Sequence, residues 1–180
     1  MTPTDSELVS LAVSSDDVGA FGELVRRHQS AVRRFLRHLT RGNDSLADDL
    51  AQEAFLQAHR GLSRFRGDAP FLTWILGIAH NHYRNARRRR RDEVPLESDE
   101  ARMVHAPSLE RRTDLRQDLS AAMPRLAADE QLAVRLAFEN GLSHSEIAAL
   151  LQWPLGTVKT HLARGKDKLR ELMSAWNPQI

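Results

Sequence analysis

The strongest constraint on the fold of this chain is the stretch from Gly141 to Leu172, which reads GLSHSEIAALLQWPLGTVKTHLARGKDKLREL. Ser143 and Glu146 have the Ser-x-x-Glu spacing of a capping box, which predicts that a helix starts at Ser143. Pro154 cannot continue that helix, but it is tolerated at the start of a new one. The stretch therefore predicts two helices joined by a tight turn at residues 152–154.

The second of these helices is longer and basic. We expect it to bury Val158, Leu162 and Leu169, whose spacing is that of one apolar face. The residues expected to point outward are Thr157, Lys159, Thr160, Ala163, Arg164 and Lys166. A short helix, a tight turn and a basic second helix form a helix-turn-helix, whose second helix fits the major groove of DNA. The alternative is an αα-hairpin with a solvated basic face. The agreement of cap, turn and one-sided charge favours the helix-turn-helix.

Charge is unevenly distributed along the 180 residues, although the net charge is only +2. Residues 1–91 carry 15 Lys and Arg against 10 Asp and Glu, whereas residues 92–112 carry 3 against 6. Residues 113–180 carry 8 of each sign, with five of the basic residues between Lys159 and Arg170. This pattern predicts two nucleic-acid contacts separated by an acidic connector.

Several classes of protein are not indicated by this sequence. The longest apolar run, residues 71–79, is interrupted by Thr73 and Gly77 and falls short of the roughly 18 residues of a membrane helix, so we expect no membrane insertion. The first ten residues lack the pattern of a secretion signal, which leads us to expect a cytoplasmic protein. The absence of cysteine excludes disulfides and thiolate chemistry.

No catalytic or metal-binding constellation can be recognised. The chain has no phosphate-binding Gly-rich loop and no Gly-x-Ser-x-Gly motif. His80 and His82 are two residues apart and would point to different sides of a helix, which makes a poor metal pair. Asp48 and Asp49 are adjacent rather than facing each other, which does not suit acid/base catalysis. We therefore expect no enzyme, no cofactor and no metal.

Hydrophobic spacing predicts four helices in the N-terminal half, at about residues 5–14, 16–39, 44–60 and 71–91. The first is expected to place Leu8, Leu11 and Ala12 on one side. The third has an exposed acidic and amide face, made of Asp48, Asp49, Gln52, Glu53 and Gln57. A solvated helix side usually explains such a run. Because the carboxylates cluster on one side of an otherwise basic domain, a protein partner is the competing interpretation.

The fourth helix changes character along its length. Its inner side is expected to hold Phe71, Trp74, Ile75 and Ile78. It then becomes polar and basic, with His80, Asn81, His82, Tyr83, Arg84, Asn85 and Arg87 to Arg91. Asn and Arg suit base edges and phosphates, and an aromatic ring can stack on an unpaired base. The competing interpretation is a solvated helix end or a non-specific phosphate contact.

The second half follows a segment without periodicity. Residues 92–108 hold two prolines and several acids, which predicts a flexible, extended linker. Further helices are predicted at residues 109–122, before Pro124, and at residues 129–140, where Gly141 ends the helix. No strand signal is present. The predicted fold class is all-α, with two small helical domains joined by a flexible acidic linker.

Together these motifs resemble those of bacterial RNA polymerase sigma factors of the extracytoplasmic-function (ECF) class in the sigma-70 family. The segment from Asp48 to Arg91, DDLAQEAFLQAHRGLSRFRGDAPFLTWILGIAHNHYRNARRRRR, is similar to sigma region 2. The segment from Gly141 to Leu172 is similar to sigma region 4, although residues 157–162 also resemble the helix-turn-helix of response regulators. The resemblance implies region 2 at residues 1–91, a linker at 92–108 and region 4 at 109–180.

The resemblance also implies roles for particular residues. The positions matching those that bind the polymerase are Asp48, Asp49, Gln52 and Glu53. The positions matching the loop and helix that open and read the −10 promoter element are Arg64, Arg66, Gly67, Asp68, His80, Asn81, Arg84, Asn85 and Arg88. The positions matching the −35 recognition helix are Thr157, Lys159, Thr160, Arg164 and Lys166. The loop would capture a flipped non-template base, and this binding would offset the cost of melting without nucleotide hydrolysis.

The implied function is that of a sigma factor, which binds core RNA polymerase and directs promoter-specific initiation. The implied partners are the beta-prime clamp helices and the beta flap of the polymerase, promoter DNA and an anti-sigma factor. One alternative is a helix-turn-helix regulator that binds duplex DNA without being a polymerase subunit, which leaves the acidic face at residues 48–57 unexplained. Another is an interaction module that binds no DNA.

Three departures from the family pattern stand out. Gln152 replaces the usual Gly of the turn, so a positive φ there would carry a modest strain cost. Ala127 and Ala128 stand where the family often has two prolines. His82 and Tyr83 stand where small or apolar residues are common, so the −10 sequence cannot be carried over from relatives.

Overall fold

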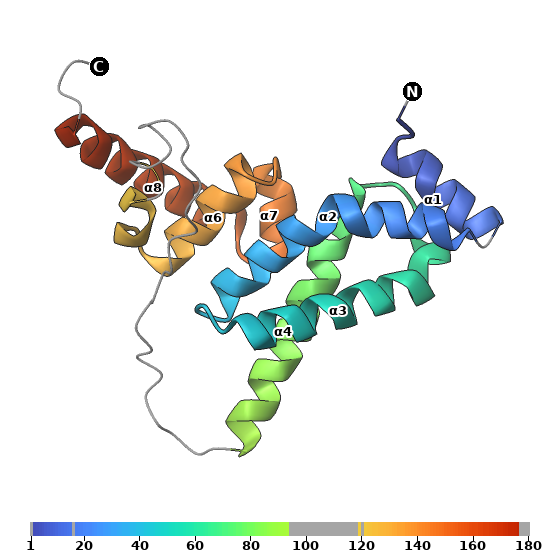
Figure 1. Ribbon diagram of the computed structural model, residues 1–180. Coiled ribbons are helices and arrows are strands. Elements are labelled where there is room, and N and C mark those ends of the chain that lie inside the picture. The colour runs from blue at the N-terminus through green and yellow to red at the C-terminus, as the bar shows by residue number, and fades with distance from the viewer. Residues whose placement is uncertain (1, 16, 94–118, 120, 177–180) are drawn as a thin grey trace. The chain divides into compact units, whose positions relative to one another are not determined.

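The computed structural model describes residues 2–15, 17–93, 119 and 121–176 (Figure 1). Within these residues all regular secondary structure is helical, which confirms the all-α prediction. The chain forms two compact units, Met1–Val104 and His105–Ile180. The segment expected to be the linker lies almost wholly outside the described residues, as does most of the helix expected at residues 109–122. None of the described helices is both long and apolar enough to cross a membrane.

The described residues of the first unit form four α-helices and one short 3-10 helix. Their bounds are α1 (Asp5–Ser14), α2 (Val18–Leu39), α3 (Asp44–Gly61), η1 (Leu62–Arg64) and α4 (Phe71–Glu93). The helix starts are fixed by local side chains: Thr4 and Glu7 form a capping box before α1, and Asn43 Oδ1 accepts the Leu46 N–H at 3.0 Å before α3. The four expected helices are therefore present.

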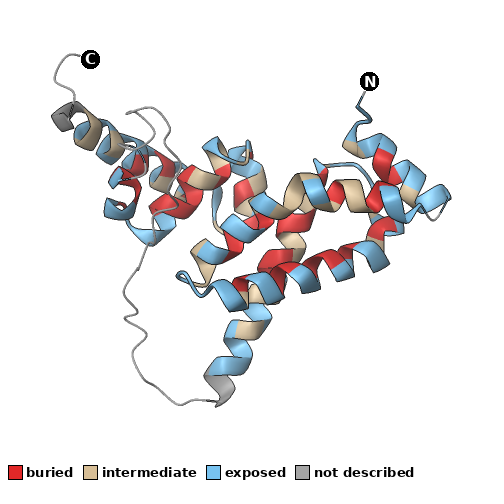
Figure 2. Cartoon of the chain, viewed as in Figure 1, coloured by how far each residue is buried: buried red, intermediate tan, exposed pale blue. Residues whose placement is uncertain are grey.

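The core of the first unit lies between α2, α3 and α4 (Figure 2). Leu24 and Leu36 of α2 and Ile75 and Leu76 of α4 are fully buried. The buried face of α3 is largely alanine, at positions 47, 51, 54 and 58, and such small side chains let neighbouring helices approach closely. This core supports α4 along its first half.

Two burial expectations for this unit were wrong in detail. In α1 the buried side chains are Leu8 and Val9, while Leu11 is 44% exposed, so the side expected to hold Leu8, Leu11 and Ala12 is only partly the one that packs. Trp74 and Ile78 on α4 are half-buried rather than fully enclosed. Trp74 lies at the edge of the core, beside the loop that precedes α4.

The second unit contains η2 (Met123–Arg125), α6 (Ala128–Phe138), α7 (His144–Leu151) and α8 (Leu155–Trp176). Ser143 caps α7 as expected: its Oγ accepts the Glu146 N–H at 3.3 Å, and Glu146 Oε2 accepts the Ser143 N–H at 2.8 Å. Gln152 adopts the left-handed conformation, with φ 56° and ψ 38°. The tight turn between α7 and α8 is thus confirmed, with Gln152 in a conformation that favours Gly.

The packing of α8 against α6 depends on one residue without a side chain. A Cβ atom on Gly165 would lie 2.8 Å from Cγ2 of Val134, closer than nonbonded carbons tolerate. Leu136 of α6, Ile147 of α7 and Val158 of α8 complete the core, all with 0% exposure. Gly165 therefore lets the Val134 side chain of α6 pack directly against the backbone of α8.

Candidate nucleic-acid interface

The exposed face of α3 contains three polar side chains that are free of intramolecular partners. Asp49, Gln52 and Glu53 are exposed, and none makes a hydrogen bond or ion pair with another described residue. Leu56, one turn further on, is 45% exposed and adds an apolar group that the sequence analysis did not single out. A carboxylate and amide surface with an apolar neighbour suits a protein partner better than DNA.

Asp48 differs from these neighbours. It is exposed, but its Oδ1 lies 3.3 Å from Nε of Arg33 on α2. A second pair, Arg37 with Asp44 at 3.0 Å, joins the same two helices. Asp48 thus forms an ion pair within the first unit, unlike Asp49, Gln52 and Glu53, with which the sequence analysis grouped it.

The arginines of α2 are largely neutralised in the same way. Glu23 pairs with Arg26 at 2.6 Å and with Arg27 at 2.9 Å, and Asp5 of α1 pairs with Arg27 at 3.1 Å. The hydrogen bond that Arg27 donates to Glu23, together with the nearby Asp5, raises the pKa of Arg27 above its usual value. Arg34 is exposed and has no ion-pair partner among the described residues.

The loop between η1 and α4 presents its predicted residues to solvent. Arg64, Arg66, Gly67 and Asp68 are all exposed, and Gly67 has a φ of +76°, which favours Gly. Phe65 anchors the loop: its ring centroid lies 5.2 Å from that of Trp74 and 5.8 Å from that of Phe71. Sequence reasoning missed this anchor, although three aromatic residues within ten positions were a usable signal.

The polar half of α4 brings most of its predicted residues to one exposed surface. Asn81, Arg84, Asn85 and Arg88 are exposed and lie at helical spacing. His80 is the exception, because it is only 8% exposed and its ring lies 6.3 Å from that of Phe35 on α2. The apolar face of α4 continues through Ala79 to His80, so burial argues against the expected role of His80 in reading DNA.

On α8, four of the five predicted residues are exposed: Lys159, Thr160, Arg164 and Lys166. Thr157 is half-buried. Thr160 Oγ1 donates to the Gly156 carbonyl at 2.9 Å, and Lys166 Nζ lies 5.8 Å from the ring centre of Phe138, which is 63% exposed. Thr160 and Lys166 thus have local partners, whereas Lys159 and Arg164 have none among the described residues.

An ion pair between a buried carboxylate and a partly exposed lysine fixes α8 relative to α6. The Glu130 side chain is 5% exposed, and its two carboxylate oxygens accept from Lys168 Nζ at 2.9 and 2.8 Å. Burial alone would raise the pKa of Glu130. The hydrogen bonds from Lys168 and the Ala127 N–H, with the nearby positive charge, outweigh that effect and lower the pKa below its usual value. Helical spacing could not predict this pair, because its members are 38 residues apart.

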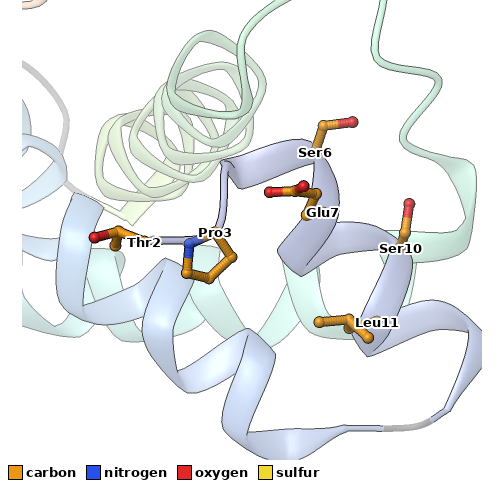
Figure 3. A pocket seen from close by; sticks show the side chains of 6 residues that line it. All are labelled: Thr2, Pro3, Ser6, Glu7, Ser10 and Leu11. Atoms are coloured by element: carbon orange, nitrogen blue, oxygen red, sulfur yellow. The ribbon is translucent and has the colours of Figure 1, made fainter.

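A hollow of about 520 Å³ lies beside α1 (Figure 3). It is lined by Thr2, Pro3, Ser6, Glu7, Ser10 and Leu11. The Glu7 carboxylate already accepts from the Thr4 N–H at 2.6 Å and from Thr4 Oγ1 at 2.9 Å, which lowers its pKa. No residue singled out for DNA or protein binding lines this hollow, so it forms no part of the candidate interface.

Comparison with known proteins agrees with this arrangement. Residues 24–93 match the family model of Sigma-70 region 2, and residues 116–169 match that of Sigma-70, region 4. The ECF RNA polymerase sigma-E factor of Escherichia coli (strain K12) is 32% identical over 179 residues, which cover 92% of each chain. The RNA polymerase sigma-H factor of Pseudomonas aeruginosa is 32% identical over 181 residues, which cover 92% of this chain and 91% of that protein.

Two solved structures share the fold. The sigma factor RpoE of Bartonella quintana, solved with the anti-sigma factor NepR, is 26% identical with a TM-score of 0.64, over 87% of this chain and 98% of that one. CnrH, solved with the cytosolic domain of CnrY, is 26% identical with a TM-score of 0.60, over 95% of this chain and 97% of that one. A regulator with only a helix-turn-helix would not contain region 2, so that alternative is not favoured. This chain belongs to the ECF class of sigma-70 family RNA polymerase sigma factors.

Proposed function

We propose that this sigma factor directs promoter-specific initiation by binding core RNA polymerase through α3 and reading two promoter elements through α4 and α8. The observation that carries this proposal is the separation of two surfaces within the first unit. Asp49, Gln52 and Glu53 form an acidic and amide surface on α3, whereas the exposed residues of α4 are Asn and Arg. For α4 this description covers residues 71–90. Surfaces of such different chemistry suit simultaneous contact with protein and DNA.

At the −10 element, the loop would hold an unpaired base. Arg64 and Arg66 are exposed cations beside Gly67, whose φ is +76°, and Phe65 fixes the loop to α4. Cations on this exposed loop would neutralise phosphates, and binding of the extruded base would offset an unstacking cost of a few kcal/mol. The exposed face of α4, with Asn81, Arg84, Asn85 and Arg88, would read the adjoining DNA. His80 is left out of this set because it is buried.

At the −35 element, α8 would enter the major groove. Lys159 and Arg164 are exposed cations without intramolecular partners among the described residues, so they are available for phosphates or guanine edges. Thr157, Thr160 and Lys166 complete the proposed contact surface.

The proposed protein partners are the beta-prime clamp helices, the beta flap and an anti-sigma factor. RpoE was solved with an anti-sigma factor and CnrH with the cytosolic domain of CnrY, and we extend control by an anti-sigma factor to this chain. Because the proposed partners, polymerase and promoter DNA, are in the cytoplasm, we propose that this sigma factor acts there. Initiation in this scheme requires binding energy alone, with no catalytic residue, metal or cofactor from this chain.

Run-off transcription tests the proposal directly. Purified core polymerase is incubated with a library of promoter fragments, with and without the full chain. We expect specific starts that require the chain and share paired upstream motifs. Duplex binding without any chain-dependent start would instead identify a regulator.

Charge reversal tests the assignment of α3. The double substitution Asp49→Lys and Glu53→Lys should weaken binding to core polymerase by about ten- to a hundredfold, because like charges would then face a cationic partner. The matched control is Asp44→Lys, which lies on the same helix but is ion-paired with Arg37. If the double variant binds core polymerase as tightly as the wild type, this surface of α3 is not the polymerase-binding surface.

A further inference from the structure

A hydrogen bond lies at the point where α4 leaves the packed core. His82 Nε2 is 2.6 Å from Oε1 of Gln57 on α3. His82 is half-buried, whereas every residue from 84 to 90 is exposed except Ala86, which is half-buried. Figure 1 shows the C-terminal part of α4 projecting past α3. The bond therefore holds α4 where the support of its apolar face ends.

Both partners of this bond adjoin residues with a proposed role. Gln57 follows Glu53 by four residues, so the two share the exposed face of α3. His82 follows Asn81 directly and precedes Asn85 by three residues, which places it beside the DNA-facing side of α4. The bond thus joins the surface proposed for polymerase to the surface proposed for the promoter.

We propose that His82 and Gln57 are positioning residues that orient Asn81, Arg84 and Asn85 for the −10 element while α3 is bound to polymerase. This inference rests on the proposed function. Because Gln57 offers its carbonyl oxygen, the imidazole donates from Nε2, and any form of the ring with a proton on Nε2 makes the same bond. The pair acts through the orientation of α4 and needs no contact of its own with DNA.

The coupling can be measured with a double-mutant cycle in the full chain. The variants are His82→Ala, Gln57→Ala and both together, each combined with core polymerase on a promoter selected by the wild-type chain. Permanganate reactivity of unpaired thymines gives the rate of promoter opening, and a fluorescence competition assay gives core affinity separately. His144→Ala serves as a control, because His144 is exposed and has no partner among the described residues.

We expect each single substitution to slow promoter opening by about three- to tenfold, the range of one hydrogen bond, with core affinity changed less than about twofold. The double variant should be no slower than the slower single variant, because the second substitution removes nothing more. Gln57→Glu keeps an acceptor and should retain the wild-type rate within about twofold. Thermal unfolding verifies the fold. If His82→Ala unfolds, His82→Phe keeps a ring and removes the donor.

Two results would overturn the inference. Multiplicative slowing in the double variant would show that the two side chains act independently, as it would if His82 contacted DNA itself. An equal loss of core affinity and opening rate would place Gln57 in the polymerase interface alone. A wild-type chain that supports no specific start would instead refute the proposed function, so the two failures are distinguishable.

Discussion

The helices α8 and α4 carry the proposed DNA contacts, and different interactions hold them in place. α8 is fixed to α6 by the ion pair between the buried Glu130 carboxylate and the partly exposed Lys168, and by the close approach at Gly165. α4 is held through its first half by apolar packing of Ile75 and Leu76, and its second half projects from that core. α8 is therefore packed along much of its length, whereas α4 is packed only along its first half.

This difference matches the two tasks proposed for the helices. The major groove of a −35 duplex has a nearly fixed shape, so a rigid helix reads it without losing conformational freedom on binding. A −10 element changes from paired to unpaired during opening. A helix that projects from its core can follow a strand that moves. The following substitutions test the contrast, from the largest expected effect to the smallest.

Glu130→Gln should remove the ion pair with Lys168 that holds α8 against α6. We expect a loss of about 2 to 3 kcal/mol in the free energy of unfolding at pH 7, because Lys168 loses its charged partner and a buried acceptor is weakened. The control is Glu139→Gln, in a more exposed pair with Arg135, which should cost less than about 0.5 kcal/mol. Urea denaturation measures both. Equal losses in the two variants would show that burial of the Glu130 carboxylate does not increase the contribution of its ion pair to stability.

The same substitution should flatten the pH dependence of stability. The pKa of Glu130 is lower in the folded protein than its usual value of 4.5. Its stabilising contribution is therefore complete well above pH 4.5 and is lost as the pH falls through the folded pKa. Urea denaturation between pH 7 and pH 3 should show a smaller decline for Glu130→Gln than for the wild type. If the stability of the two proteins declined equally with pH, Glu130 would not be the group responsible for this pH dependence.

Gly165→Ala should separate α8 from α6. The new Cβ would lie 2.8 Å from Val134, and this overpacking should cost about 1 to 3 kcal/mol, offset by about 0.5 to 1 kcal/mol of helix preference for Ala. Denaturant unfolding should therefore show a net loss of about 1 kcal/mol. Weaker binding to −35 duplexes should accompany it. Full stability would mean that the two helices can shift apart at no cost.

Arg164→Ala should weaken binding to a −35 duplex by about 1 kcal/mol and reduce the slope of log K against log salt by about 0.9. A loss of one phosphate contact accounts for both changes. Arg88→Ala on α4 provides the comparison, because it should leave −35 duplex binding unchanged while impairing promoter opening. Fluorescence anisotropy at several salt concentrations distinguishes the two helices.

Gly77→Ala on α4 should have the smallest effect and the opposite sign to Gly165→Ala. No atom lies within 4 Å of a Cβ built there, so Ala should stabilise the fold by about 0.5 kcal/mol through its helix preference. Thermal unfolding should show a rise of a few degrees. A destabilised variant would mean that α4 is packed as tightly as α8.

Local features of the sequence were enough to predict the helices and their ends. Ser143 and Glu146 cap α7 through atoms only three residues apart, and Gln152 takes the positive φ that its place in the turn implied. Helical spacing also predicted the exposed faces of α3 and α8, but not which of their side chains form ion pairs or hydrogen bonds within the fold. These features depend on neighbours within one or two turns, so the sequence contains the necessary information.

Features that depend on another helix could not be predicted. His80 is buried because Phe35 of α2 lies against it, and Asp48 is paired because Arg33 of α2 reaches it. The contact between Glu130 and Lys168 spans 38 residues. Composition and periodicity describe one helix at a time, and each of these outcomes is decided by which helices cross and at what angle.

The ion pairs along α2 have a consequence for how the first unit meets DNA in solution. With four of its arginines neutralised by nearby carboxylates, this helix adds little to the electric field at a distance. The exposed arginines at positions 87 to 90 of α4 then dominate the positive end of the unit. We expect an approaching strand to be drawn toward that end before any base is read, so that the first encounters favour the orientation proposed for initiation.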